Sequence, residues 1–267
     1  MIDDLFAKEK DTGMNEPCAS PTPQPDPEEI EKAEVRTYFN EARGGTCVEV
    51  GANEPLAPTS QSLHLEERLD WSCLLVEPIP ELAAKARALR PRATVCECAC
   101  TRPDRTGEID LYIPVLPSGD IFEHASIQRN PDDFHYAAHR TIRVRTDTLS
   151  HLLEEHCVDR IDLLSLDVEG AELEVLQGLD FDRWRPRLIL MEDKCVFLSK
   201  HLFLKRKGYV LVRKLNSNSW YVPRGAERPP WPLGERLRLF HRMYLGIWPR
   251  KARYAIRKRD WSPLKSL

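Results

Sequence analysis

Two acidic side chains follow an apolar run in the middle of the chain. Residues 161–166, with the sequence Ile-Asp-Leu-Leu-Ser-Leu, have the composition of a buried parallel strand, and Asp167 and Glu169 come soon after it. Beyond them the apolar residues recur at the spacing of a helix. Because ligands bind at the carboxyl ends of strands in open α/β sheets, these two carboxylates are candidates for binding a ligand or accepting a proton.

Two earlier strands end in residues suited to a nucleotide. The strand expected at 46–50 runs into the turn Gly51-Ala-Asn, where a glycine lets the backbone approach a ligand closely. Glu77 follows the strand expected at 73–76, and a carboxylate there can accept hydrogen bonds from both ribose hydroxyls of an adenosine. The turn lacks the pattern G-x-G-x-x-G, which disfavours a nicotinamide-dependent oxidoreductase.

Four stretches of the chain resemble the FkbM-type methyltransferases, a branch of the class I S-adenosylmethionine-dependent enzymes. They occur in the family's order and cover roughly residues 46–223 together with the segments between them. The stretches are Cys47-Val-Glu-Val-Gly-Ala-Asn-Glu-Pro55, Leu74-Leu-Val-Glu-Pro78, Ile161 to Gly178, and Leu188-Ile-Leu-Met-Glu192. The family usually has a glycine where Pro55 stands, a departure that concerns the path of the turn but not the role of Gly51.

The resemblance implies a class I methyltransferase fold. This is a Rossmann-like α/β sandwich with a mostly parallel seven-stranded sheet and an antiparallel C-terminal hairpin. The implied cofactor is S-adenosylmethionine, with Glu49 expected to contact its methionine part and Glu77 its ribose. The implied cofactor-binding residues are Glu49, Gly51, Ala52, Asn53, Glu77, Cys98, Ala99 and Asp167.

Methyl transfer from a sulfonium to oxygen or nitrogen is a direct displacement, so the protein has to align the acceptor and exclude water. A hydroxyl acceptor also needs a base. Our catalytic candidates are Asp167, Glu169 and His124, the last from a long loop expected at about 114–140 that would cover the acceptor as a lid. Two other histidines of this segment are alternatives, His135 and His139.

A second version of the site contains a magnesium ion. Its ligands would be Asp167, Glu192 and Asp193, all expected at carboxyl ends of strands, because hard oxygen ligands suit magnesium. We expect a reaction without a metal. In that case Glu192 is a sheet-edge acid that contacts a neighbouring loop.

The chain divides by composition into three parts. Residues 1–27 are rich in Pro, Asp, Glu and Ser and are expected to be disordered, residues 28–223 form the methyltransferase domain, and residues 224–267 form a basic amphipathic extension. The extension has twelve Lys/Arg against three acids, whereas the whole chain has a net charge of -3. This asymmetry favours contact of the extension with an anionic membrane or an acidic partner, or packing of its apolar stripe on the domain.

The remaining features indicate a protein of the cytoplasm, peripheral to the inner membrane face if the extension binds there. The first residues lack a signal-peptide pattern, and no run of eighteen apolar residues occurs. The eight cysteines include no metal-type C-x-x-C pair. Cys96, Cys98 and Cys100 alternate on a strand expected at 94–99 and are interpreted as small buried hydrophobic residues.

The leading hypothesis is an O-methyltransferase that acts on a sugar hydroxyl of a glycan or glycolipid, or on a secondary metabolite. Those acceptor classes come from the resemblance. The alternative is a non-catalytic adaptor that keeps the fold and acts through its basic extension. Nucleic acid is disfavoured as a substrate because the basic residues concentrate in the extension and no Asn-Pro-Pro-Tyr-like or catalytic-cysteine motif occurs.

Overall fold

The computed structural model describes residues 26–115, 138–229 and 232–258. A seven-stranded sheet forms its centre, in the order β3-β2-β1-β7-β8-β10-β9. The strands are β1 (Thr46–Val50), β2 (Ser72–Val76), β3 (Thr94–Cys96), β7 (Leu163–Leu166), β8 (Leu188–Glu192), β9 (Tyr209–Leu215) and β10 (Asn218–Pro223). Only β10 runs antiparallel to its neighbours, so the expected mostly parallel sheet with a C-terminal hairpin is confirmed.

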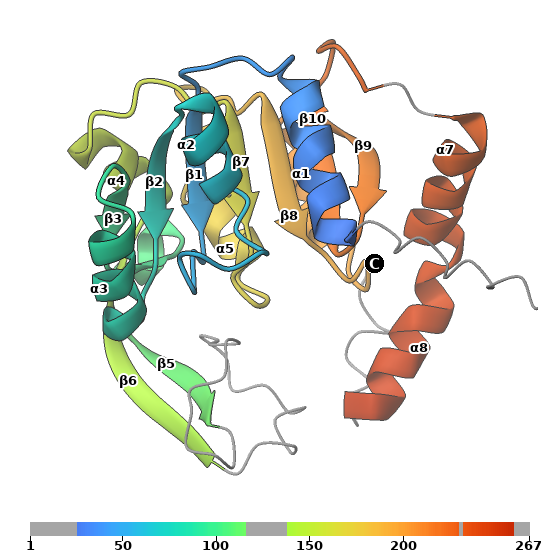
Figure 1. Cartoon of the computed structure of the whole chain (residues 1–267). Helices are drawn as coiled ribbons and strands as arrows, with labels where there is room; N and C mark the ends of the chain where they lie inside the picture. The colour runs from blue at the N-terminus through green and yellow to red at the C-terminus, as the bar shows by residue number, and fades with distance from the viewer. Residues whose placement is uncertain (1–25, 116–137, 230–231, 259–267) are drawn as a thin grey trace, which may run out of the picture.

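Helices cover both faces of this sheet (Figure 1). On one face lie α1 (Pro27–Tyr38), α2 (Leu63–Leu69) and α3 (Pro80–Leu89), and on the other α4 (Leu149–Glu155), α5 (Glu172–Gln177) and α6 (Ser199–Arg206). The alternation of side chains along a strand explains the two layers, because Cys47 packs in the first core and Val48 in the second. Glu49 therefore lies on the α2 face of β1.

The first crossover helix is shorter than its sequence indicates. The pattern predicts a helix over 59–69, but α2 begins at Leu63. The polar residues before it form a loop that folds back onto Glu49 instead of entering the helix. Buried hydrogen bonds to a carboxylate thus outweigh the helical propensity of this short segment.

The strand expected at 94–99 divides into two. Its first part is β3, and the second part joins a separate three-stranded sheet that the sequence pattern does not reveal. That sheet contains β4 (Ala99–Cys100), β5 (Gly107–Val115) and β6 (Ala138–Asp147), and β5 and β6 extend below the main sheet in Figure 1. Cys96, Cys98 and Cys100 are all buried in one hydrophobic core, as expected.

The C-terminal arm, residues 232–258, is helical and lies beside strand β9 (Figure 1). It comprises α7 (Leu233–Phe240), a π-helical turn (His241–Leu245) and α8 (Ile247–Lys258). In the described part of the chain, no helix has the length and apolar character needed to cross a membrane.

Candidate functional site

The turn after β1 approaches the end of β7 very closely. Gly51 has a φ of +84°, and a Cβ atom placed on it would lie 1.8 Å from the carbonyl oxygen of Asp167. The backbone N–H groups of Gly51 and Ala52 both donate to Val76 O, at 2.9 and 3.2 Å. Only glycine allows this approach, and it brings the ends of β1, β2 and β7 together at one place.

Glu77 is buried at the end of β2 and oriented by the backbone. The N–H of Asn53 donates to its Oε2 at 2.7 Å, and the N–H of Ile79 donates to its Oε1 at 2.9 Å. Burial raises the pKa of the carboxyl to about 7, although these two hydrogen bonds act in the opposite direction. Each oxygen retains a lone pair for a further donor, as binding of a ribose requires.

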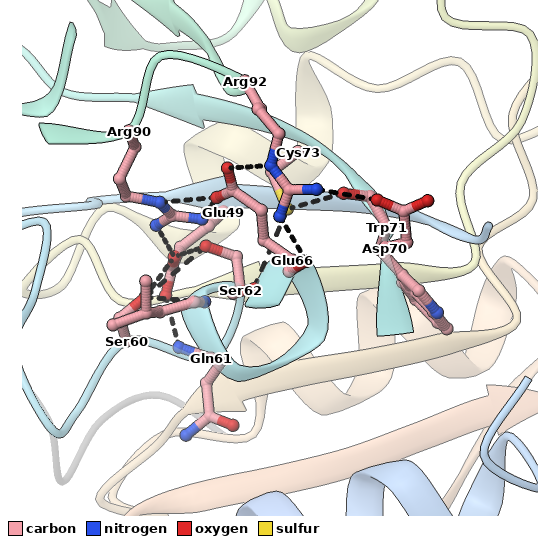
Figure 2. A network of polar contacts seen from close by, with 11 residues as sticks. Glu49, Ser60, Gln61, Ser62, Glu66, Asp70, Trp71, Cys73, Arg90 and Arg92 are labelled. Carbon is pink, nitrogen blue, oxygen red and sulfur yellow. Dashed lines mark hydrogen bonds and ion pairs between the residues drawn. The ribbon is translucent and has the colours of Figure 1, made fainter. Parts of the chain in front are cut away.

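Glu49 is engaged by the loop that precedes α2 (Figure 2). Ser60 Oγ donates to its Oε2 at 3.0 Å, and the N–H of Gln61 donates to its Oε1 at 2.7 Å. Ser62 Oγ also donates to Oε2. The carboxylate therefore fixes the loop against β1, and only part of it remains available to a cofactor.

Arg90, at the end of α3, extends this network. Its Nε and Nη2 donate to Glu66 Oε2 at 2.7 and 2.5 Å, and its Nη1 lies 3.9 Å from Glu49 Oε2 (Figure 2). The side chains of Arg90, Glu49 and Glu66 are nearly inaccessible to solvent. One buried guanidinium thus offsets two buried carboxylates, which ties α2 and α3 to the end of β1.

A cavity opens at these strand ends. It is lined by each of the cofactor-binding candidates: Glu49, Gly51, Ala52, Asn53, Glu77, Cys98, Ala99 and Asp167. Glu169 lines it as well. Residues far apart in the sequence therefore line one cavity, and three of the four motifs contribute to it.

Three carboxylates gather beside this cavity, and two of them line it. Asp167, Glu169 and Glu192 each place a carboxylate oxygen within 4.8 Å of the others. The sharp turn after β7 makes this possible, because Glu169 adopts a φ of +49° and Gly170 a φ of +104°. Burial and the nearby charge of Glu169 raise the pKa of Glu192, so this group holds a proton more readily than an exposed glutamate.

Lys200 of α6 connects the two strand ends that carry these acids. Its Nζ donates to Glu172 Oε2 at 3.0 Å and to the carbonyl of Glu192 at 3.3 Å. Glu172 Oε1 in turn accepts from the N–H of Gly170 at 2.9 Å. Lys200 and Glu172 therefore fix the turn after β7 relative to the end of β8.

The expected magnesium ligand set needs a correction. Asp193 is buried, accepts from the N–H of Cys195 at 2.9 Å and lies 3.4 Å from Lys200 Nζ. The acid that joins Asp167 and Glu192 is instead Glu169. The chain leaves β8 after Glu192, and contacts with Cys195 and Lys200 hold the Asp193 carboxylate away from the other two acids.

The histidines fall outside this arrangement. His124 and His135 belong to residues 116–137, which lie outside the described residues, as does most of the expected acceptor lid. For His139 only the backbone is described, in β6 opposite Pro114 of β5. Asp167 and Glu169 are thus the catalytic candidates that the structure places at the cavity.

Several residues of the cavity were not predicted from the sequence. Ser60 and Gln61 line it from the loop before α2, Leu111 from β5 and Asn218 from β10. The polar run Thr59-Ser-Gln-Ser62 was the available signal, because consecutive polar residues favour a loop that caps a buried acid. Leu111 and Asn218 carry no such signal, since tertiary contacts alone bring them there.

Two curated proteins show sequence similarity to this chain. Methyltransferase sdnD of Sordaria araneosa is 30% identical over 162 residues, which cover 51% of this chain and 61% of that protein. Methyltransferase 1 of Beauveria bassiana (strain ARSEF 2860) is 28% identical over 148 residues, which cover 51% and 54% of the two chains. The chain therefore spans less than two thirds of the length of either relative.

A solved structure from Pyrococcus horikoshii, described as a proposed RNA methyltransferase, covers 74% of this chain and 82% of that one at 11% identity, with a TM-score of 0.39. The sequence profile of the methyltransferase FkbM domain matches residues 49–211. This match includes the turn after β1, Glu77 and the acidic turn after β7, and it extends over more than half of the chain. The chain therefore belongs to the FkbM methyltransferase family.

Proposed function

We propose that this protein is an S-adenosylmethionine-dependent O-methyltransferase. One observation supports this most strongly: Gly51, Glu77 and Asp167, from three separate motifs, line a single cavity at the carboxyl ends of parallel strands. Family membership implies S-adenosylmethionine as the methyl donor. The cavity thus combines a nucleoside-binding edge with a group of carboxylates suited to the acceptor.

The residues of the cavity fit this cofactor. Gln61 is 3% exposed, and its Oε1 atom has no hydrogen-bond partner among the described residues. Such a buried acceptor is costly unless a ligand donates to it, and the cofactor's ammonium group is a suitable donor. Glu77 would accept from the ribose, and Cys98 and Ala99 would flank the adenine.

The carboxylates provide the acceptor chemistry. The cofactor supplies an electrophilic methyl group, and an alcohol attacks it efficiently only when a base accepts the hydroxyl proton. Asp167 and Glu169 are suited to that role because both line the cavity. Glu192 holds a proton more readily and would orient the acceptor by a hydrogen bond.

The acceptor that we propose is a sugar hydroxyl of a glycan or glycolipid, or a hydroxyl of a secondary metabolite. The acidic surroundings support a neutral hydroxyl acceptor over an anionic one, because a phosphate or carboxylate would be repelled. A divalent ion on Asp167, Glu169 and Glu192 would add an orienting charge, and the proposal does not depend on one.

Calorimetric titration with S-adenosylhomocysteine tests the cofactor, with NAD as the control ligand. We expect micromolar binding of S-adenosylhomocysteine and none of NAD. An acceptor screen with labelled methyl donor then tests the transfer, with hydroxyl and amine compounds in parallel. Labelling of amines alone would contradict O-methylation, and absence of S-adenosylhomocysteine binding would contradict the cofactor assignment.

A second candidate function is a non-catalytic adaptor, and the exposed apolar residues of the C-terminal arm favour it. Methyl transfer would require the carboxylates at the cavity, whereas an adaptor would not. Glu169→Gln should strongly reduce methyl transfer and leave S-adenosylhomocysteine affinity within a few fold. If no acceptor is ever labelled and binding through the arm persists, the adaptor function is supported instead.

A further inference from the structure

Exposed apolar side chains concentrate in the C-terminal arm. Of the ten large hydrophobic residues that are exposed in the described part of the chain, seven belong to residues 232–258. They are Leu233, Leu237, Phe240, Tyr244, Leu245, Trp248 and Ile256. The arm has only about a tenth of the residues, so this concentration requires an explanation.

The exposure does not result from a poorly packed arm. A different stripe of the same helices packs on the domain: Leu239 and Met243 form a core cluster with Cys195. Arg250 Nε donates to Cys195 O at 3.0 Å, and Tyr244 Oη lies 2.8 Å from His201 Nε2. The domain therefore holds the arm in place, and a second apolar stripe remains exposed.

The stripe expected from the sequence is the exposed one. Leu233, Leu237, Phe240 and Tyr244 recur at helical spacing and are all exposed, although Tyr244 also contacts His201 of the domain. The packed residues Leu239, Met243 and Ile247 form a second stripe, and sequence periodicity alone does not tell which of the two stripes is buried. Two apolar stripes on one helical arm mean that two surfaces are to be covered.

A groove runs between the arm and the edge strand β9. It has a volume of about 570 Å³, and its apolar walls come from Val210 and Val212 of β9 and from Leu237 and Phe240 of α7. Four Lys/Arg residues line it, and no acidic residue does: the cations are Lys205, Arg224, Arg228 and Arg236. Within the described residues none of the four has a carboxylate partner.

The whole arm is strongly positive. Residues 232–258 contain eight Lys/Arg against the single acid Glu235, a formal charge of +7 in a chain whose total is -3. Cations beside apolar side chains match a partner that is anionic at its surface and apolar beneath it.

The degree of exposure distinguishes between two such partners. A small amphiphile in a binding pocket has most of its surface enclosed by protein. Leu233 and Leu237 are 67% and 60% exposed, so the wall of the groove is open on the side of α7. An open apolar wall suits a surface into which these side chains insert, not a ligand that enters the protein.

We propose that the C-terminal arm docks on the surface of an anionic lipid bilayer. The exposed apolar side chains enter the interfacial region, and the groove cations and the arginines of the arm contact lipid phosphates. Such docking would be peripheral, since no helix of the described residues is long and apolar enough to cross a membrane. It stands independently of the proposed reaction, because docking requires neither cofactor nor turnover.

Co-sedimentation of the full chain with vesicles tests the proposal. We expect binding to vesicles of phosphatidylcholine with about 30% phosphatidylserine, no binding to phosphatidylcholine alone, and a marked loss at high salt. Leu237→Glu and Phe240→Glu should each lower the partition coefficient about tenfold, since each loses an inserted apolar side chain. Arg236→Ser should lower it about fivefold.

Matched controls come from the opposite parts of the molecule. Leu56→Glu replaces a side chain that is 48% exposed outside the arm, and Arg68→Ser removes an exposed cation of α2; neither should change vesicle binding.

Equal binding to neutral and anionic vesicles, or loss of binding in the controls as well, would overturn the proposal. A dimer in light scattering that Leu237→Glu dissociates, without vesicle binding by the parent chain, would assign the surface to a second copy instead.

Discussion

The cavity at the strand ends and the C-terminal arm handle their polar and charged groups in opposite ways. At the cavity, Glu49 and Glu77 are buried and receive two or more hydrogen bonds each from the protein itself. In the arm, Arg236 lines an open groove without a carboxylate partner in the part of the chain that the structure describes. Apolar side chains beside it are more than half exposed.

The difference shows which region is organised in advance of its partner. A buried carboxylate must be satisfied by the protein, so the cavity has a defined shape before any ligand binds. Solvated cations and exposed apolar residues require no such partner to fold. Substitutions should therefore change stability and ligand affinity at the cavity, but only association on the exposed side of the arm.

The largest effect is expected at Arg90. Arg90→Met leaves the buried carboxylate of Glu49 without its cation and Glu66 with only the more exposed Arg92, at 3.7 Å, and the free energy of unfolding should fall by about 3–5 kcal/mol. Urea denaturation measures this. Arg87→Met is the matched control, because this arginine pairs with Glu97 outside the network, its side chain is 46% exposed and its loss should cost less than about 1 kcal/mol. Equal losses would mean that burial of the network contributes nothing.

Gly51 comes next. A Cβ at Gly51 meets the carbonyl oxygen of Asp167 at 1.8 Å, so Gly51→Ala should destabilise the protein by about 3 kcal/mol and weaken S-adenosylhomocysteine binding. Gly44 also has a positive φ, but nothing lies within 4 Å of the position that its Cβ would take, so Gly44→Ala should cost only about 1 kcal/mol. If denaturant titrations give similar losses of stability for the two variants, the turn after β1 can move away from Asp167.

Glu77 should govern the affinity for the cofactor. Glu77→Gln replaces one acceptor oxygen by an amide that faces a backbone N–H, so S-adenosylhomocysteine should bind about 30-fold more weakly. Calorimetry measures this loss, and circular dichroism checks that the fold persists. An unchanged affinity would remove Glu77 from the ribose site.

The same carboxyl predicts a pH dependence. Because the pKa of Glu77 in the folded protein is about 7, affinity for S-adenosylhomocysteine should rise about tenfold from pH 6 to pH 8, and Glu77→Gln should abolish that rise. The raised pKa also means that the stability contributed by protonated Glu77 is complete below pH 4.5 and is lost as the pH rises through 7. Thermal unfolding of the ligand-free protein at several pH values checks the sign.

The smallest change in stability is expected on the exposed side of the arm. Leu237→Glu should change the free energy of unfolding by less than about 0.5 kcal/mol, since the side chain is 60% exposed. Leu239→Ala, two residues further on in the packed stripe, should cost about 2 kcal/mol. If both substitutions are equally destabilising, the two stripes do not differ and the arm is simply part of the core.

Local sequence patterns predict the strands of the main sheet, and where a predicted boundary differs from the structure there is a physical cause. The strand expected at 46–50 has those bounds in the structure, because a glycine that favours a turn follows its apolar residues directly. The helix expected from residue 59 begins later because Ser60 and Ser62 hydrogen-bond Glu49 across eleven and thirteen positions of sequence. Long-range partners of this kind have no local signature.

The family, the order of the motifs along the chain and the acids at the strand ends can be predicted from the sequence, because each depends on a short run of residues. Which acids lie together depends on tertiary packing. Glu169 joins Asp167 and Glu192 through a left-handed turn, while Asp193 contacts Lys200 instead. Tertiary packing also decides which apolar stripe of the arm is buried. Both outcomes depend on packing between segments distant in sequence, and periodicity within one segment cannot specify that packing.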